Sequence, residues 1–311
     1  MIDEPQYFLR IAALGKYPTL PITKQAYEEI EEARRTLFVA LNIEEKYDLA
    51  LSNFIDLEKE LLALTAESMV RADFGYDRFY QIRSTLNRKL SNFIVSGKMY
   101  TEQIANDAAK CSTNKEETRQ TITALKSNQY DQKLDYRTME TLRNHIAHSG
   151  MTVHTVRLPN HWTTNENETQ ELEFNIDIFA AKKILAENNG FKRSVLNELP
   201  ELFDLKKAAR SYIASISTIQ EETRRITSEN INNSRKTIEQ HIEAYGLANN
   251  GETFALGAYF KPLNSDKKSK PVMLMLEWDD VRVSLTKKND SITNMHKRYA
   301  TNTISEKQSD H

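Results

Sequence analysis

The chain has 311 residues, of which 39% are hydrophobic and 28% charged, and its formal net charge is −2. Its 8 glycines and 7 prolines are too few for an all-β sandwich, and the composition is typical of a strongly helical, water-soluble protein. The near-neutral charge excludes a global basic field, so a nucleic acid would have to bind a local patch. The single cysteine, Cys111, excludes an intramolecular disulfide and a cysteine-based zinc cluster.

The cellular location is predicted from two features. No apolar run reaches the roughly 18 residues that a membrane-spanning helix needs. The first residues, MIDEPQYFLRIAALG, begin acidic and lack the basic region of a signal peptide. We therefore expect a cytoplasmic protein that does not associate with membranes.

Helical periodicity dominates the first 150 residues, where apolar residues recur at spacings of three and four. The pattern predicts helices over residues 23–41, 44–72, 77–108, 112–128 and 132–148. Gly75 marks a break between two of them, and Gly150 is the expected stop of the last. Ser112 or Thr113, followed by acidic residues, predicts a helix cap. This region is expected to form an α-helical bundle.

The second half has a mixed pattern. QELEFNIDIF alternates apolar and polar residues, which predicts a strand, and a helix is expected over about 191–199. A helical stretch over 205–245 loses its apolar seam near SENINNS. The helix either breaks there or changes its packing partner, and we favour two helices packed on the same bundle. FALGAYFKPL, PVMLMLEWD and VRVSLTK predict a small sheet. The expected fold is mainly α: a helical bundle in residues 1–155, an α+β region with a long helix and a small antiparallel sheet in 156–290, and a polar, flexible tail in 291–311.

The stretch LRNHIAHSG, residues 142–150, closes the predicted bundle and concentrates chemistry-bearing side chains. At 100° per residue, Asn144 and His148 lie on one helical face, whereas Arg143 is turned by about 100° from Asn144. Arginine offers a permanent planar cation for phosphate oxygens, and histidine can exchange a proton near neutral pH. This combination of residue types suits a phosphodiester substrate.

This stretch resembles the motif of the HEPN superfamily, in which an Arg is followed after four to six residues by a His. Asn144 matches the polar residue that often follows that Arg, and the segment YDRFYQIRSTLNRKLSNFIVSGKMYTEQ resembles its counterpart in HEPN proteins of prokaryotic defence and toxin systems. The resemblance covers residues 1 to about 155. It implies a metal-independent endoribonuclease that needs no cofactor, a homodimer with a composite active site at its interface, and restraint by an antitoxin or another regulatory partner.

The same resemblance implies roles for three residues in the cleavage of single-stranded RNA. The ribose 2′-OH would attack the adjacent phosphorus, and Arg143 would stabilise the charge that develops on it. His148 would act as general acid or base, or as a second clamp, and Asn144 would orient His148 or bind the phosphate. The expected products are a 2′,3′-cyclic phosphate and a 5′-OH end. The alternative is a non-catalytic scaffold in which this stretch binds a partner or nucleotide.

Other candidates compete with this site. A metal site would use four histidines within seventeen residues, namely His145, His148, His154 and His161. RKTIEQH, residues 235–241, repeats the Arg-to-His spacing without the Asn, and we interpret it as an ordinary helix surface. Cys111 is expected to be inert. A basic face and two tryptophans could contact RNA, although solvation and packing are the simpler expectations; these residues are Arg78, Arg83, Arg88, Lys89, Trp162 and Trp278.

Overall fold

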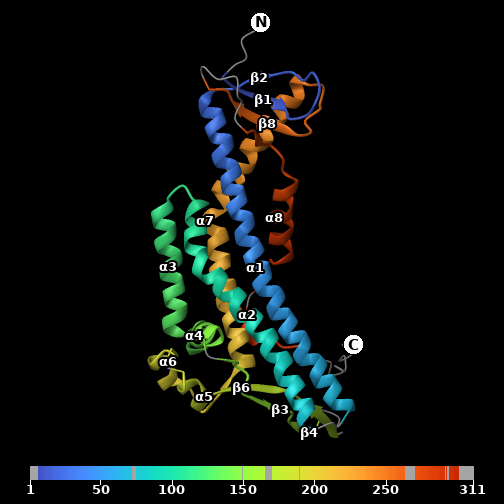
Figure 1. Cartoon of the computed structure of the whole chain (residues 1–311), viewed down its shortest axis with the longest axis vertical. Helices are drawn as coiled ribbons and strands as arrows, with labels where there is room; N and C mark the ends of the chain where they lie inside the picture. Colours follow the sequence, from blue (N-terminus) through green and yellow to red (C-terminus); the bar gives the residue numbers. More distant parts are fainter. Residues whose placement is uncertain are drawn as a thin grey trace, which may run out of the picture.

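Two long helices, α1 (Lys24–Val70) and α7 (Leu205–Ala248), lie side by side along most of the molecule (Figure 1). The computed structural model describes residues 6–71, 75–148, 150–164, 170–188, 190–262, 270–290, 292 and 294–300. The other helices are α2 (Tyr76–Lys110), α3 (Lys115–Gln132), α4 (Leu134–His148), α5 (Lys182–Ala186), α6 (Arg193–Glu198), α8 (Glu277–Lys288) and the 3-10 turn η1 (Met295–Lys297). The chain is mainly α-helical, which confirms the predicted fold class.

Short antiparallel strands form small sheets at both ends of the long helices (Figure 1). One sheet has the order β2-β1-β8-β9, the second β3-β6-β7, and the third is the hairpin β4-β5. The strands are β1 (Tyr7–Ile11), β2 (Leu20–Pro21), β3 (Thr155–Arg157), β4 (Asn160–Thr164), β5 (Gln170–Phe174), β6 (Asp177–Ala181), β7 (Leu202–Asp204), β8 (Leu256–Phe260) and β9 (Val272–Met273). Strand β1 pairs with β8, in a register that sets Leu9 opposite Ala258. The first and last thirds of the chain therefore meet in one sheet.

The predicted breaks in the two long helices are wrong. Helix α1 is continuous through residues 42–44, and α7 is continuous through SENINNS. In α1 the apolar seam is interrupted by Glu44, which is buried because Arg224 of α7 neutralises it. In α7 the polar stretch stays in the helix because Asn230 donates a hydrogen bond to the carbonyl of Cys111. Polar residues that are paired across helices thus look like gaps in a sequence pattern.

Two further local predictions are corrected by the structure. VRVSLTK forms the body of helix α8, because Glu277, Asp279 and Asp280 occupy its first turn, where acidic side chains favour a helix. The cap of α3 is Asn114, whose side chain accepts a hydrogen bond from the backbone of Glu117, and neither Ser112 nor Thr113 takes this role. By contrast, α2 and α4 match their predicted positions within two residues.

The hydrophobic core extends across both halves of the chain. Phe93 of α2 meets Tyr212 of α7 edge to face, with ring centroids 5.8 Å apart. Gly97 is required beside this contact, since a Cβ at that position would lie 2.6 Å from the Tyr212 ring. The boundaries near residues 155 and 290 stay predictions, and most of the predicted tail, 301–311, lies outside the described residues. None of the described helices is long and apolar enough to cross a membrane.

Candidate functional site

Helix α4 carries the candidate motif, and Glu140 fixes its orientation in the bundle. The hydroxyl groups of Tyr212 in α7 and Thr101 in α2 donate to Glu140 Oε1 over 2.6 and 2.9 Å. Lys98 of α2 forms an ion pair with the other carboxylate oxygen. The carboxylate is thus held from two helices, and Leu142 is fully buried, so α4 is anchored in the bundle just before its last turns.

The three predicted site residues follow Glu140 in the C-terminal turns of α4. Asn144 and His148 are exposed, as their spacing predicts, and Arg143 is half-buried. The Arg143 guanidinium donates to Asn144 Oδ1 over 3.3 Å, so these two side chains are brought together. Within the described residues, His148 contacts neither of them by a hydrogen bond, and none of the three takes part in an ion pair. Apart from the hydrogen bond between Arg143 and Asn144, the side-chain donors and acceptors of the three residues remain available to a ligand or a second protein chain.

The ring nitrogens of the neighbouring histidines are hydrogen-bonded to backbone groups and to the side-chain amide of Asn188. His145 Nε2 and His154 Nε2 both face the carbonyl of Met151, at 3.3 and 2.8 Å. A carbonyl only accepts, so each Nε2 carries the proton. His154 Nδ1 accepts from the amide of Ala181 over 2.9 Å, and the amide of Asn188 lies 3.0 Å from His145 Nδ1. We name this pair, His145 and His154, the histidine clamp.

The histidine clamp is held neutral. Burial lowers the pKa of both imidazoles, although the Met151 carbonyl opposes the shift. A second proton on His154 Nδ1 would also face the Ala181 N–H, which is itself a donor. These nitrogens are not free to ligate a metal, and no group of three or more metal-ligating residues occurs in the described part of the chain. The structure therefore does not support the alternative histidine metal site.

A pocket of about 230 Å³ opens beside the histidine clamp, between the first two turns of α2 and strand β3. One wall consists of aromatic and basic side chains and the other of residues that follow α4. The lining residues are Tyr76, Phe79, Tyr80, Arg83, His154, Thr155 and Val156. The sequence pattern pointed to Arg83 as part of a basic face but gave no sign of the aromatic residues around it.

The two walls of this pocket are joined by Asn87, a buried side chain of α2. Its Oδ1 accepts from the backbone amides of Thr152 and Val153 over 2.9 and 2.8 Å. Its Nδ2 donates to the carbonyls of Val153 and Arg83 over 3.1 and 3.0 Å. One amide thus satisfies four backbone groups and fixes the segment before β3 against the helix. The pocket is built from rigidly connected parts.

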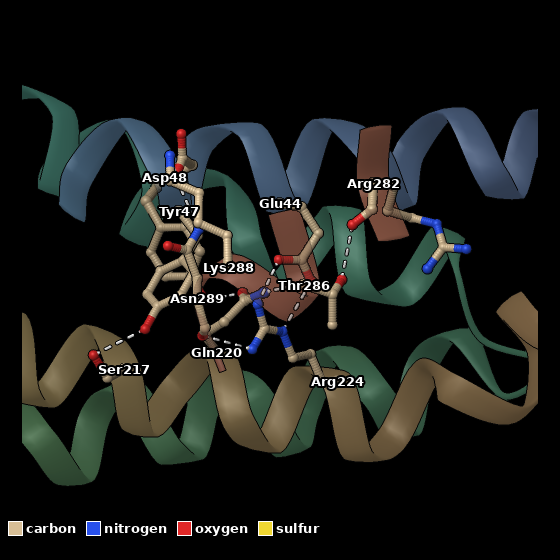
Figure 2. Close-up of polar contacts among 11 residues, drawn as sticks. Glu44, Tyr47, Asp48, Ser217, Gln220, Arg224, Arg282, Thr286, Lys288 and Asn289 are labelled. Carbon is tan, nitrogen blue, oxygen red and sulfur yellow. Dashed lines mark hydrogen bonds and ion pairs between the residues drawn. The ribbon is translucent and has the colours of Figure 1, made fainter. Parts of the chain in front are cut away.

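A second polar cluster lies inside the bundle, where α1, α7 and α8 meet (Figure 2). Glu44 accepts from Arg224 Nε and Nη2 over 2.9 and 2.6 Å, and from Gln220 over 2.9 Å. The third nitrogen of Arg224 donates to the carbonyl of Asn289, and the Tyr100 hydroxyl donates to Gln220. The adjoining pocket measures about 160 Å³. These groups satisfy one another's hydrogen-bonding capacity. The cluster therefore joins the helices and leaves few donors or acceptors for catalysis.

The remaining candidates are accounted for by structure. Arg235 pairs with Asp279 in α8, so the second Arg-to-His spacing belongs to a helix contact. Cys111 is buried, and burial raises its pKa to about 12, which leaves the thiol protonated and inert. Trp278 packs near Phe38, with ring centroids 6.2 Å apart. The other singled-out residues are either paired, as Arg78 with Glu67 and Lys89 with Asp56, or exposed, as Arg83, Arg88 and Trp162.

Comparison of the chain with protein-family models, with curated proteins and with solved structures gave no match. The function has to be inferred from the chemistry of the side chains themselves.

Proposed function

We propose that this protein is a metal-independent endoribonuclease that cuts single-stranded RNA at the C-terminal end of α4. The observation that carries the proposal is the contrast among neighbouring side chains. Both ring nitrogens of His145 are engaged, one by the Met151 carbonyl and the other by the side-chain amide of Asn188, whereas the side chain of His148, one turn later, is exposed and has no hydrogen bond within the described residues. A proton-transfer group must be accessible in this way.

Each residue has a distinct part in the proposed reaction. The ribose 2′-OH attacks the adjacent phosphorus, and its proton passes to a base while the 5′-oxygen leaves with a proton. His148 serves as that base or acid, or as a second clamp, because an imidazole can take either part near neutral pH. Arg143 stabilises the negative charge that builds up on the phosphate oxygens. Asn144, which is hydrogen-bonded to Arg143, orients the guanidinium or His148, or binds the phosphate.

The active site of this proposal is completed by a second copy of the chain. Arg143 and His148 leave α4 about 100° or more apart around the helix axis, and no contact joins them among the described residues. Two α4 ends that meet across a dimer axis would bring one arginine and one histidine from each copy into a single cleft. The proposed biological role is that of a toxin or antiviral effector in the cytoplasm, restrained by an antitoxin or another regulatory partner.

The test is incubation of end-labelled single-stranded RNA with purified protein in excess EDTA. The wild type should leave 2′,3′-cyclic phosphate and 5′-OH ends, and His148→Ala should lose the activity. His161→Ala is the matched control, because His161 is also an exposed histidine but lies on the hairpin β4-β5. Arg143→Ala should be as inactive as His148→Ala, whereas Arg34→Ala, an exposed arginine of α1, should remain active.

The results separate the nuclease from its alternative, a non-catalytic scaffold. Equal cleavage by wild type and His148→Ala would remove His148 from the mechanism. If cleavage is lost only in the chelator, a metal enzyme is present and this proposal fails. Absence of cleavage by every variant, including protein freed of any co-purified partner, would favour the scaffold.

A further inference from the structure

The pocket between α2 and β3 combines aromatic rings with an exposed arginine. Tyr76, Tyr80 and Arg83 follow one another at spacings of four and three, so they lie on one face of α2. The side chains of Tyr76 and Tyr80 are 82% and 57% exposed. Arg83 is exposed and forms no ion pair within the described residues. A cluster of large rings left in water next to an unpaired arginine indicates a binding surface.

The shape and charge of the pocket narrow the class of ligand. At about 230 Å³ it is smaller than the roughly 300–1,000 Å³ of pockets for drug-sized ligands, so it suits one planar group. Its other wall presents His154, whose two nitrogens are occupied by Met151 and Ala181. His154 therefore presents an uncharged aromatic ring to a ligand in the pocket. A planar ring system attached to an anion matches two tyrosines and one guanidinium.

The pocket is linked to the motif helix α4 through the histidine clamp. The His154 ring stands edge to face with that of His145, with centroids 6.1 Å apart. His145 follows Asn144 directly in α4, so the histidine clamp is shared by the pocket and the motif helix. Asn87 holds the intervening backbone to α2. A nucleic acid strand bound at the end of α4 would pass close to these rings.

We propose that this pocket stacks a nucleobase of the single-stranded RNA whose backbone is bound at α4. Tyr76 and Tyr80 supply the stacking faces, and Arg83 contacts the phosphate of the stacked nucleotide. Stacking of this kind tolerates any base, because every base has a π-face. The pocket therefore positions the strand and discriminates single-stranded from paired RNA. This inference rests on the proposed nuclease for its substrate but makes a separate prediction about binding.

The test measures binding by fluorescence anisotropy with a short fluorescein-labelled single-stranded RNA of mixed sequence. All variants are made in the His148→Ala protein, so the probe is not consumed. Tyr80→Ala should weaken binding roughly 5- to 150-fold, the range that corresponds to loss of one stacked base. Tyr80→Phe should restore it, since the ring rather than the hydroxyl is needed. Tyr299→Ala, which removes an exposed tyrosine outside the pocket, should bind like the parent.

Arg83 is tested through the salt dependence of the same binding. A phosphate contact releases counterions, so Arg83→Ala should lower the magnitude of the slope of log affinity against log salt by about 0.7, the value for one contact to a single strand. Arg34→Ala, another exposed arginine, should leave the slope unchanged. A change in affinity without a change in slope would exclude the phosphate contact.

The outcomes distinguish the pocket from the nuclease. If the wild type cleaves RNA but Tyr80→Ala and Tyr76→Ala bind as tightly as Tyr299→Ala, the stacking proposal is overturned and the nuclease stands. If the wild type does not cleave, yet binding depends on Tyr80, the pocket is supported and the nuclease fails. No detectable binding by the parent overturns the stacking proposal directly. Double-stranded RNA bound as tightly as single-stranded RNA would do the same.

Discussion

Replacement of Glu44 by leucine should destabilise the fold strongly, because it leaves Arg224 without its partner. The Glu44 side chain is 7% exposed and that of Arg224 23%, so the pair is largely removed from water. Loss of one member of a buried pair costs about 3–5 kcal/mol. Arg224 keeps its hydrogen bond to Asn289 and some contact with solvent. We therefore expect the lower end of this range, about 3 kcal/mol of unfolding free energy.

Two companion variants separate charge from shape. Glu44→Gln preserves the volume and one acceptor, so about half of the loss is expected, in line with a hydrogen bond to a charged group at roughly 1.5–3 kcal/mol. The double variant Glu44→Leu/Arg224→Leu removes both charges and should be more stable than Glu44→Leu alone, since no unpaired cation remains inside. The double variant is expected to be the more stable of the two because Arg224 is largely buried.

The measurement is urea unfolding followed by far-ultraviolet circular dichroism, with midpoints compared at constant slope. Glu222→Ala is the matched control, because Glu222 pairs with the exposed Arg225 on the same helix as Arg224 and should change stability little. If Glu44→Leu unfolds at the same urea concentration as Glu222→Ala, the burial argument is refuted. A double variant less stable than Glu44→Leu would show that the leucines cannot pack in this space.

Three further results are expected. The lowered pKa values of His145 and His154 mean that the unfolded chain binds more protons, so their contribution to stability is complete above about pH 6.5 and is lost as the pH falls below it; a melting temperature independent of pH between about 7.5 and 5.5 would contradict this. Asn114→Ala should cost about 0.5–1 kcal/mol through loss of the α3 cap, and an unchanged urea midpoint would refute it. Asp279→Ala leaves Arg235 and Arg282 without the buried carboxylate and should speed hydrogen exchange throughout α8; exchange unchanged in α8 would show that other contacts hold this helix.

The helices that the sequence predicted well are those with apolar seams. Helices α2 and α4 bury continuous stripes of apolar residues, and their own spacing is sufficient to locate them. Helices α1 and α7 were predicted as four shorter pieces because Glu44 and Asn230 interrupt their seams. Both residues are satisfied by partners on other helices, and such partners cannot be read from one segment. Strand β1 was missed for a similar reason, since its pairing partner β8 lies far along the chain.

The candidate site was predictable only where it depends on a single helix. The outward position of Asn144 and His148 follows from their spacing along α4. The burial of His145 and the exposure of His148 do not follow from this spacing, because the ring nitrogens of His145 are hydrogen-bonded to Met151 and Asn188, which lie beyond the helix. The pocket could not be predicted from the sequence either, because its walls come from α2 and β3, which meet only in the folded chain.

The position of α7 sets the order in which the protein can be completed during synthesis. Helix α4 rests on α7 through Tyr136, whose ring centroid lies 5.2 Å from that of Tyr212, and through Glu140. A ribosome that has just made His148 must therefore add about sixty more residues before the face behind the motif can be covered. The sheet that joins β1 to β8 closes later still. A chain that ends before α7 would carry the motif on an unsupported helix, so the proposed nuclease would become competent only after α7 has been made.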